Sequence, residues 1–235
     1  MRHFQLFSAR RSRDRLIASA LLISALHLAF ASIASGDGEF ALPKPRLESD
    51  VAVEQALASR RSVREFASEA LSLAAVSQLL WAAQGVTHPK GLRTAPSAGA
   101  LYPLEVLVVV GDVSGLRAGV YRYEPRGHQL VLESQGELRA RVAEAALDQE
   151  WIATAPAIVV LTAVYERTAR KYRKRTERYV HIEAGHAAQN VYLQAEALGL
   201  GTTMVGAFHD DKLSRVLGLK EREVPIALLP VGKPL

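Results

Sequence analysis

Residues 93–110 read RTAPSAGALYPLEVLVVV, and this stretch decides the fold. Mostly small residues lie between Pro96 and Pro103, which indicates a loop of fixed shape. Small side chains let a backbone approach a flat ligand closely, so that its N–H and C=O groups can bond the edge of a heteroaromatic ring. A simple turn is the alternative interpretation. The apolar, β-branched run over 104–110 predicts a buried strand directly after the loop.

Helix signals lie on both sides of this stretch. Asp50 is a candidate N-cap for a helix over 51–59, and Ser72 caps a second helix that ends at Gly85. Another helix is predicted over 137–147. The longest predicted helix ends at Gly199, and its apolar positions keep helical spacing: Val180, Ala184, Ala187, Ala188, Val191, Ala195 and Leu198.

Strand signals are short and alternate with these helices. A hairpin is predicted from strands at 120–123 and 129–132, joined by the turn at 125–127. Further strands are predicted at 157–162, 202–205 and 226–231. This order fits an α+β layer better than a doubly wound parallel sheet. No G-x-G-x-x-G follows a strand, which disfavours a Rossmann dinucleotide site.

The N-terminal segment has the pattern of an export signal. Arginines precede an apolar run over 16–34, and A-x-A cleavage sites end at Ala31 and Ala34. We therefore expect residues 1–34 to be a cleaved signal peptide and the protein to reach the bacterial periplasm. The alternative is an uncleaved signal anchor in the inner membrane, because the run approaches the roughly 20 residues that span a bilayer.

Residues 35–48 contain two glycines and two prolines and are expected to be a linker, and residues 49–235 are expected to form one folded domain. The chain has 235 residues, of which 49% are hydrophobic, enough for a single core. It has no cysteine, which excludes disulfides, thiolate metal sites and cysteine nucleophiles. No His and carboxylate set has metal-ligand spacing, so no metal is expected.

The net charge of +5 gathers at the extreme N-terminus and over 167–178. This distribution is not a nucleic-acid signature, and we expect no nucleic-acid partner. A basic surface over 167–178 that binds membranes or nucleic acid is a competing interpretation, and it predicts steeply salt-dependent binding.

Residues 60–64, RRSVR, place three guanidinium groups and a hydroxyl within five positions. Arginine forks match phosphate oxygens in bidentate geometry, and a serine hydroxyl can complete the site. A solvated basic turn explains the same composition equally well. Two later stretches add context: GLGTTMVGAF at 199–208 repeats the small, glycine-bearing character of the first loop, and Lys233 supplies one more cation.

Four stretches in this order resemble the nitroreductase superfamily: RRSVR at 60–64, PSAGALYP at 96–103, EAGHAAQN at 183–190 and GLGTTMVGAF at 199–208. More narrowly, they resemble its SagB-type branch, which includes thiazoline and oxazoline dehydrogenases. Each motif is weak alone, but four in sequence are strong. The resemblance implies an α+β fold with a central, mostly antiparallel sheet flanked by helices, in a homodimer that binds FMN at each subunit interface.

The resemblance also assigns roles to residues. The FMN phosphate and ribityl end would be held by Arg60, Arg61, Ser62 and Arg64, with Lys233 near the same phosphate. The flavin would be lined by Pro96, Ser97, Ala98 and Gly99, and approached by the backbone N–H groups of Gly206 and Ala207. Ala100 stands where many nitroreductases carry Asn, and the loss of that side chain favours the SagB-like branch.

Lys171 and Tyr172 resemble the Lys-Tyr pair that azoline dehydrogenases use as acid and base near the flavin. Oxidation of an azoline requires a carbon-bound proton to leave while hydride passes to the flavin, and a lysine or tyrosine can take that proton. The alternative is a solvated helix face, because cations surround the pair. His186 on a long apolar helix is expected to be packed and hydrogen-bonded, and Glu183 and Gln189 are expected to be structural.

These features favour an FMN-dependent oxidoreductase that transfers hydride between flavin and a small organic or modified-peptide substrate. An NAD(P)H-dependent nitro or quinone reductase is the first alternative, and it suits an exported protein less because little NAD(P)H lies outside the cytoplasm. A flavin-binding protein without turnover is the second alternative.

Overall fold

The computed structural model describes residues 38–235. The predicted signal segment at 1–34 lies outside the described residues and stays a prediction. Within 38–235, no helix combines the length and the hydrophobicity that crossing a membrane would require.

One seven-stranded sheet forms the centre of the described chain, in the order β1-β4-β3-β2-β5-β7-β6 with every neighbouring pair antiparallel. Its strands are β1 (Glu39–Ala41), β2 (Leu104–Val110), β3 (Gly119–Glu124), β4 (Gln129–Gln135), β5 (Ala157–Ala163), β6 (Gly201–Thr202) and β7 (Val224–Gly232). The predicted strand at 104–110 and the predicted hairpin are confirmed.

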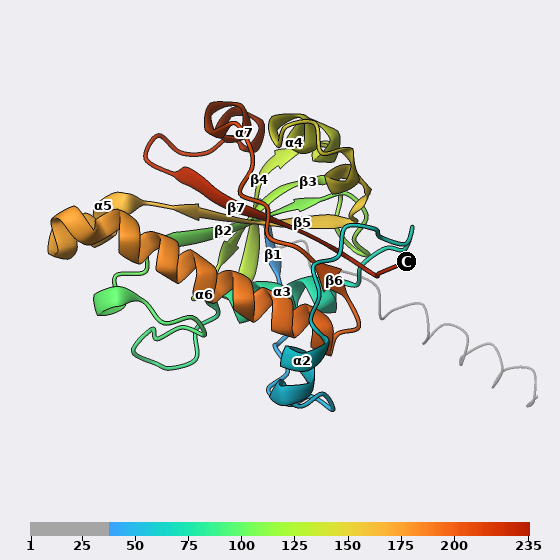
Figure 1. The fold of residues 1–235 in the computed structure, drawn as a ribbon, viewed down its shortest axis with the longest axis horizontal. Helices are drawn as coiled ribbons and strands as arrows, with labels where there is room; N and C mark the ends of the chain where they lie inside the picture. Colours follow the sequence, from blue (N-terminus) through green and yellow to red (C-terminus); the bar gives the residue numbers. More distant parts are fainter. Residues whose placement is uncertain (1–37) are drawn as a thin grey trace, which may run out of the picture. The chain divides into compact units, whose positions relative to one another are not determined.

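Two apolar cores cover the two faces of the sheet, and the period of two along β2 builds both. Leu104, Val106, Val108 and Val110 face one core, and Leu107 and Val109 face the other. The first core is covered by α3 (Leu73–Gln84) and α6 (Thr176–Ala197), and the second by α4 (Arg139–Ala145) and α7 (Asp210–Leu217), on opposite sides of the sheet (Figure 1). The predicted α+β class, with a mostly antiparallel sheet flanked by helices, is confirmed.

Two shorter helices meet α6 near its two ends (Figure 1). Helix α2 (Val53–Ser59) lies near the C-terminal part of α6, and α5 (Tyr165–Tyr172) leads into its N-terminus through the 3-10 turn η3 (Arg173–Arg175). Two further 3-10 turns are η1 (Ala98–Ala100) and η2 (Glu150–Thr154). These placements decide where the functional side chains lie.

The predicted helix boundaries are right at Ser72 and wrong at Asp50. The Ser72 hydroxyl accepts a hydrogen bond from the Ala75 amide at 3.1 Å, as an N-cap does. Helix α2 instead begins at Val53, without a side-chain cap. The amide of Val51 donates to Ser49 Oγ, and this local bond holds the chain in a bend just where the helix was predicted to start.

Two other elements are shorter than predicted. Helix α4 ends at Ala145, before two residues with positive φ, Leu147 at 59° and Asp148 at 57°. Strand β6 stops at Thr202, because the amide of Met204 donates to the Tyr192 hydroxyl instead of a neighbouring strand.

The segment expected to be a linker contributes a strand that the sequence did not predict. Strand β1 pairs with β4 at the sheet edge, and Leu42 directly after it is buried. The Pro43 carbonyl accepts a hydrogen bond from Ser77 Oγ at 2.6 Å, and Gln78 bonds both the amide and the carbonyl of Arg46. The folded part therefore begins earlier than residue 49.

Candidate active site

The loop at 96–103 is held in a strained shape by its own backbone and side-chain bonds. Gly99 has φ 63°, and the non-glycine residues Ala100 and Tyr102 also have positive φ, 54° and 47°. The amide of Tyr102 donates to Ser97 Oγ at 2.9 Å, and the amide of Ala100 donates to the Ser97 carbonyl at 3.0 Å. Positive φ at non-glycine residues costs about 1 kcal/mol each, so the surroundings must enforce this loop.

Glu183 of α6 fastens the loop through a hydrogen bond. Its carboxylate accepts a hydrogen bond from the Ala98 amide at 2.8 Å, and the residue is only 4% exposed. Burial raises the pKa of Glu183, while hydrogen bonds from Ala98 and Ser97 and the charge of His186 partly offset that rise. The structural role expected for Glu183 is therefore to hold the loop through the Ala98 amide.

Lys171 and Tyr172, at the end of α5, lie over the same loop. A Cβ placed on Gly99 would lie 3.1 Å from Tyr172 Oη and 3.2 Å from Lys171 Nζ. The Lys171 ammonium also lies 5.4 Å from the centre of the Tyr172 ring. Both side-chain tips therefore converge on one glycine of the loop, although Lys171 as a residue stays exposed and Tyr172 is half-buried.

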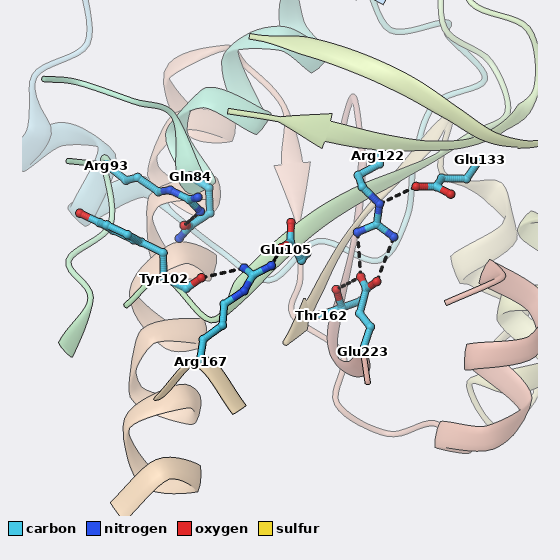
Figure 2. A network of polar contacts seen from close by, with 9 residues as sticks. All are labelled: Gln84, Arg93, Tyr102, Glu105, Arg122, Glu133, Thr162, Arg167 and Glu223. Carbon is cyan, nitrogen blue, oxygen red and sulfur yellow. Dashed lines mark hydrogen bonds and ion pairs between the residues drawn. The ribbon is translucent and has the colours of Figure 1, made fainter. Parts of the chain in front are cut away.

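A polar network ties this loop to α5, α3 and β2 (Figure 2). Arg167 of α5 donates to the Tyr102 carbonyl at 3.0 Å and forms an ion pair with Glu105 of β2. Arg93 donates to Gln84 of α3 at 2.8 Å and stacks 4.6 Å from the centre of the Tyr102 ring. Burial lowers the pKa of Arg93, and the carboxylate of Glu105 partly offsets that effect.

The RRSVR segment lies near the other end of α6. Ser62 forms a bridge with Thr202, and the amide of Val63 donates to the Thr202 carbonyl at 3.0 Å. The Arg60 guanidinium lies 5.3 Å from the centre of the Tyr192 ring, and the Arg64 guanidinium lies 5.9 Å from that of Trp151. Among residues 38–235, no carboxylate pairs with either arginine.

Tyr192 of α6 belongs to this cluster, and the sequence analysis missed it. Its hydroxyl accepts from the Met204 amide at 2.7 Å and lies 3.3 Å from Thr203 Oγ1 and 3.5 Å from Ser62 Oγ. Burial raises the pKa of Tyr192, but its three hydrogen bonds and the charge of Arg60 outweigh burial and lower it overall. A tyrosine on the same helical face as Ala184 and Ala188 would have been the only signal.

The other two predicted phosphate ligands already have partners. Arg61 Nη1 donates to the carbonyls of Ala58, Ser59 and Arg60 and so caps the end of α2. Lys233 forms an exposed ion pair with Glu69 at 2.8 Å. Their roles toward a phosphate stay predictions, and each would give up or share a present contact to bind one.

Gly206 and Ala207 lie at an open surface beside a cleft of about 470 Å³. A Cβ on Gly206 would meet no atom within 4 Å, so the backbone there is accessible to a ligand. The cleft is lined by Tyr165, Glu177, His181, Ala184, Met204, Gly206, Phe208, Asp210, Val224, Pro225 and Ile226.

The two groups of predicted site residues lie on opposite faces of α6. Glu183, which holds the Pro96–Gly99 loop, and Tyr192, which contacts Arg60 and Ser62, are nine residues apart. Nine residues make two and a half helical turns and an axial rise of about 14 Å. Within one chain, the Pro96–Gly99 loop and the RRSVR segment therefore contact α6 at different faces and different heights.

His186 differs from its expectation, because it is exposed rather than packed in the core. It lies three residues after Glu183, on the same side of α6. Gln189 is half-buried. In the part of the chain that the structure describes, no group of three or more His, Asp or Glu side chains could hold a metal ion.

A second arginine network joins side chains of β3, β4 and β5 to Glu223, directly before β7 (Figure 2). Arg122 of β3, 4% exposed, donates to both carboxylate oxygens of Glu223, at 3.0 and 2.9 Å, and to Glu133 of β4. Thr162 of β5 donates to the same Glu223. Burial alone would lower the pKa of Arg122, but the two carboxylates raise it above its ordinary value. Each of the three guanidinium nitrogens of Arg122 donates to a carboxylate of the fold.

Comparison with known proteins agrees with this geometry. The Nitroreductase family model matches residues 57–233. MJ1384 of Methanocaldococcus jannaschii is 49% identical over 186 residues, 79% of this chain and 93% of that protein. The microcin B17-processing protein McbC of Escherichia coli is 28% identical over 163 residues, 66% of this chain and 59% of that protein.

Among solved structures, a nitroreductase-like protein of Ralstonia eutropha superimposes with a TM-score of 0.75 and 31% identity, covering 87% of this chain and 93% of that one. The family match spans the loop, both helices α5 and α6, and the RRSVR segment. The predicted resemblance is thereby confirmed, and the chain belongs to the nitroreductase family of oxidoreductases.

Proposed function

We propose that this oxidoreductase uses FMN and transfers hydride between the flavin and a small organic or peptide-derived substrate, in the manner of SagB-type dehydrogenases. FMN is typical of the family. The similarity to McbC, a peptide-processing protein by name, supports a modified peptide as the substrate.

The residues of the RRSVR segment suit the FMN phosphate. Arg60, Ser62 and Arg64 offer two guanidinium groups and a hydroxyl, and no carboxylate in 38–235 neutralises those two arginines. The open backbone at Gly206 and Ala207 suits the edge of a flat ring. Pro96, Ser97, Ala98 and Gly99 would line that ring from the other side.

The separation of these two groups on α6 supports a homodimer. Because one chain holds its RRSVR segment and its Pro96–Gly99 loop on opposite faces of α6, we infer that the loop of a second copy completes each site. We therefore propose two equivalent FMN sites, each built from both subunits.

One observation favours a dehydrogenase over other flavoenzymes: Lys171 Nζ and Tyr172 Oη both approach Gly99. Bound FMN supplies the hydride acceptor. In the oxidation of an azoline, one C–H bond would give up hydride to bound FMN and the adjacent acidic position would give up a proton. Lys171 or Tyr172 takes that proton, so the electrons and protons of the two-electron oxidation balance.

The test mixes FMN-loaded protein with a thiazoline-containing peptide without oxygen and follows the loss of flavin absorbance. We expect bleaching together with conversion of the thiazoline to a thiazole. In Lys171→Ala and Tyr172→Phe, bleaching should slow by about 100-fold or more while FMN content stays unchanged. Lys174→Ala, which changes a neighbouring exposed lysine, serves as the control.

Two other results would replace this proposal. Reduction of a quinone by NADPH, without bleaching by the peptide, would assign a nitro or quinone reductase, which the similarity to MJ1384 also supports. Bound FMN with neither activity would assign a flavin-binding protein.

We also propose that residues 1–34 direct export to the periplasm. Detection of the mature chain, cut after Ala31 or Ala34, in a periplasmic extract would support it. An uncut chain in the membrane fraction would assign a signal anchor instead.

A further inference from the structure

Tyr102 is held more firmly than a loop residue normally requires. Its backbone has φ 47°, its amide is bonded to Ser97, its carbonyl to Arg167, and its ring lies under Arg93. A strained backbone persists only where surrounding contacts enforce it, and such strain gathers at functional sites. Three side chains therefore contact this one residue, and Figure 2 shows the two arginines among them.

Arg167 is the contact that reaches from α5. It stands four residues before Lys171, so both side chains leave the helix on the same face. One guanidinium nitrogen donates to the Tyr102 carbonyl and another pairs with Glu105 at the start of β2. The planar fork of arginine is what allows both bonds at once, and a lysine in its place could make only one in good geometry.

The ion pair itself is too exposed to be a major source of stability. The Arg167 and Glu105 side chains are 36% and 19% exposed, and pairs of this kind contribute little to folding. Their position is more informative than their strength. Arg167 joins α5, which carries Lys171 and Tyr172, to the loop that carries Gly99. Glu105 ties the same guanidinium to β2.

We propose that Arg167, oriented by Glu105, is a positioning residue that locks the 97–102 loop to α5 and so keeps Lys171 and Tyr172 over Gly99. The roles of Lys171 and Tyr172 rest on the proposed function above, whereas the lock itself does not. Glu183 holds the other end of the loop through Ala98, so the loop is fixed from two helices at once.

The test compares FMN-loaded wild-type protein with Arg167→Met, Arg167→Lys and Glu105→Gln. Arg170→Ala is the matched control, because Arg170 lies on the same helix, is exposed and has no ion-pair partner within 38–235. Two readouts need no substrate. One is hydrogen exchange at the amides of Ala98, Ala100 and Tyr102, and the other is the rate at which acetic anhydride acetylates Lys171 relative to Lys174.

In Arg167→Met, we expect exchange in the loop to accelerate about tenfold, since a charge-assisted hydrogen bond is lost, and the acetylation ratio to change by several-fold. Arg167→Lys should recover part of both effects, Glu105→Gln should give smaller ones, and Arg170→Ala should give none. Unchanged exchange and acetylation in Arg167→Met would overturn the proposal.

A third readout separates positioning from general loosening. With the thiazoline peptide as the probe, Arg167→Met should lower the rate of flavin bleaching about tenfold at saturating peptide while the FMN Kd stays within about twofold of wild type. A fall in FMN affinity with an unchanged bleaching rate would contradict a positioning role. If wild-type protein does not oxidise the peptide at all, the proposed function fails, while the two substrate-free readouts still decide whether Arg167 locks the loop.

Discussion

Arginines serve opposite purposes in two regions of this molecule. Arg122 of β3 is buried, and its guanidinium donates to the carboxylates of Glu133 and Glu223. Arg60 and Arg64 lie near the end of α2, where their guanidinium groups lie over aromatic rings and no carboxylate of 38–235 pairs with them. The absence of a carboxylate partner within 38–235 is what supports the proposal that Arg60 and Arg64 bind the FMN phosphate.

The largest effect is expected from breaking the internal network. Glu223→Ala removes the carboxylate that pairs with buried Arg122 and should lower the free energy of unfolding by about 3–5 kcal/mol, because an uncompensated charge stays buried. Urea denaturation measures this change. Glu69→Ala, which breaks the exposed pair with Lys233, is the control and should cost less than about 1 kcal/mol. Equal losses in the two variants would abolish the distinction between the regions.

Removing Arg60 and Arg64 should have the opposite pattern, with a large effect on FMN binding and little effect on stability. Arg60→Ala combined with Arg64→Ala should raise the FMN Kd about 100-fold, since two charge-assisted bonds are lost, and should leave stability nearly unchanged. Flavin fluorescence titration measures the Kd. The exposed pair Arg170→Ala and Arg178→Ala removes the same net charge elsewhere and should leave the Kd within about threefold. A comparable loss in both double variants would mean that only net charge matters.

Tyr192 sharpens the comparison, because the guanidinium of Arg60 lies over its ring. Tyr192→Phe leaves the Met204 amide without its acceptor and frees Ser62, and we expect the FMN Kd to rise about fivefold, equivalent to one ordinary hydrogen bond. Tyr179→Phe, whose ring packs edge-to-face on Tyr172, is the control for loss of a hydroxyl. An unchanged Kd in Tyr192→Phe would remove Tyr192 from the site.

The smallest effect concerns Glu183 and depends on pH. Its pKa is raised in the folded state, so the folded protein binds the proton more tightly than the unfolded chain. Its contribution to stability is therefore greatest at low pH and is lost as pH rises through the raised pKa. Glu183→Gln cannot titrate, so wild type should lose thermal stability relative to this variant as pH rises from about 4, near the ordinary pKa of glutamate, through the raised pKa. A constant difference in melting temperature across that range would contradict the burial argument.

The sequence predicted those elements that are determined by residues close together in the chain. The alternation of β2 between two cores follows from a run of β-branched residues, and the start of α3 follows from one serine. It failed at Asp50, where a bond from Val51 to Ser49 competes with the cap, and at the end of β6, where Tyr192 captures an amide.

The candidate site shows the same limit. The motifs located the loop and the RRSVR segment, but Arg122 and Glu223 are 101 residues apart, and nothing near either one announces the pair. In the sequence, Arg167 belongs to a run of cations that is typical of a solvated helix face. Its partners Tyr102 and Glu105 come from a loop and a strand more than 60 positions earlier, and no local pattern indicates them. Only the fold distinguishes an arginine that locks a loop from one that faces water.

The strand at 39–41 has a practical consequence for anyone trimming the protein. A chain cut after Ala34 would keep residues 35–38 ahead of β1 and preserve its pairing with β4. A chain begun at residue 49, where the sequence alone places the start of the domain, would lack β1 and leave β4 as a bare sheet edge. Bare edges recruit strands from other molecules, so such a shortened chain is expected to aggregate during expression.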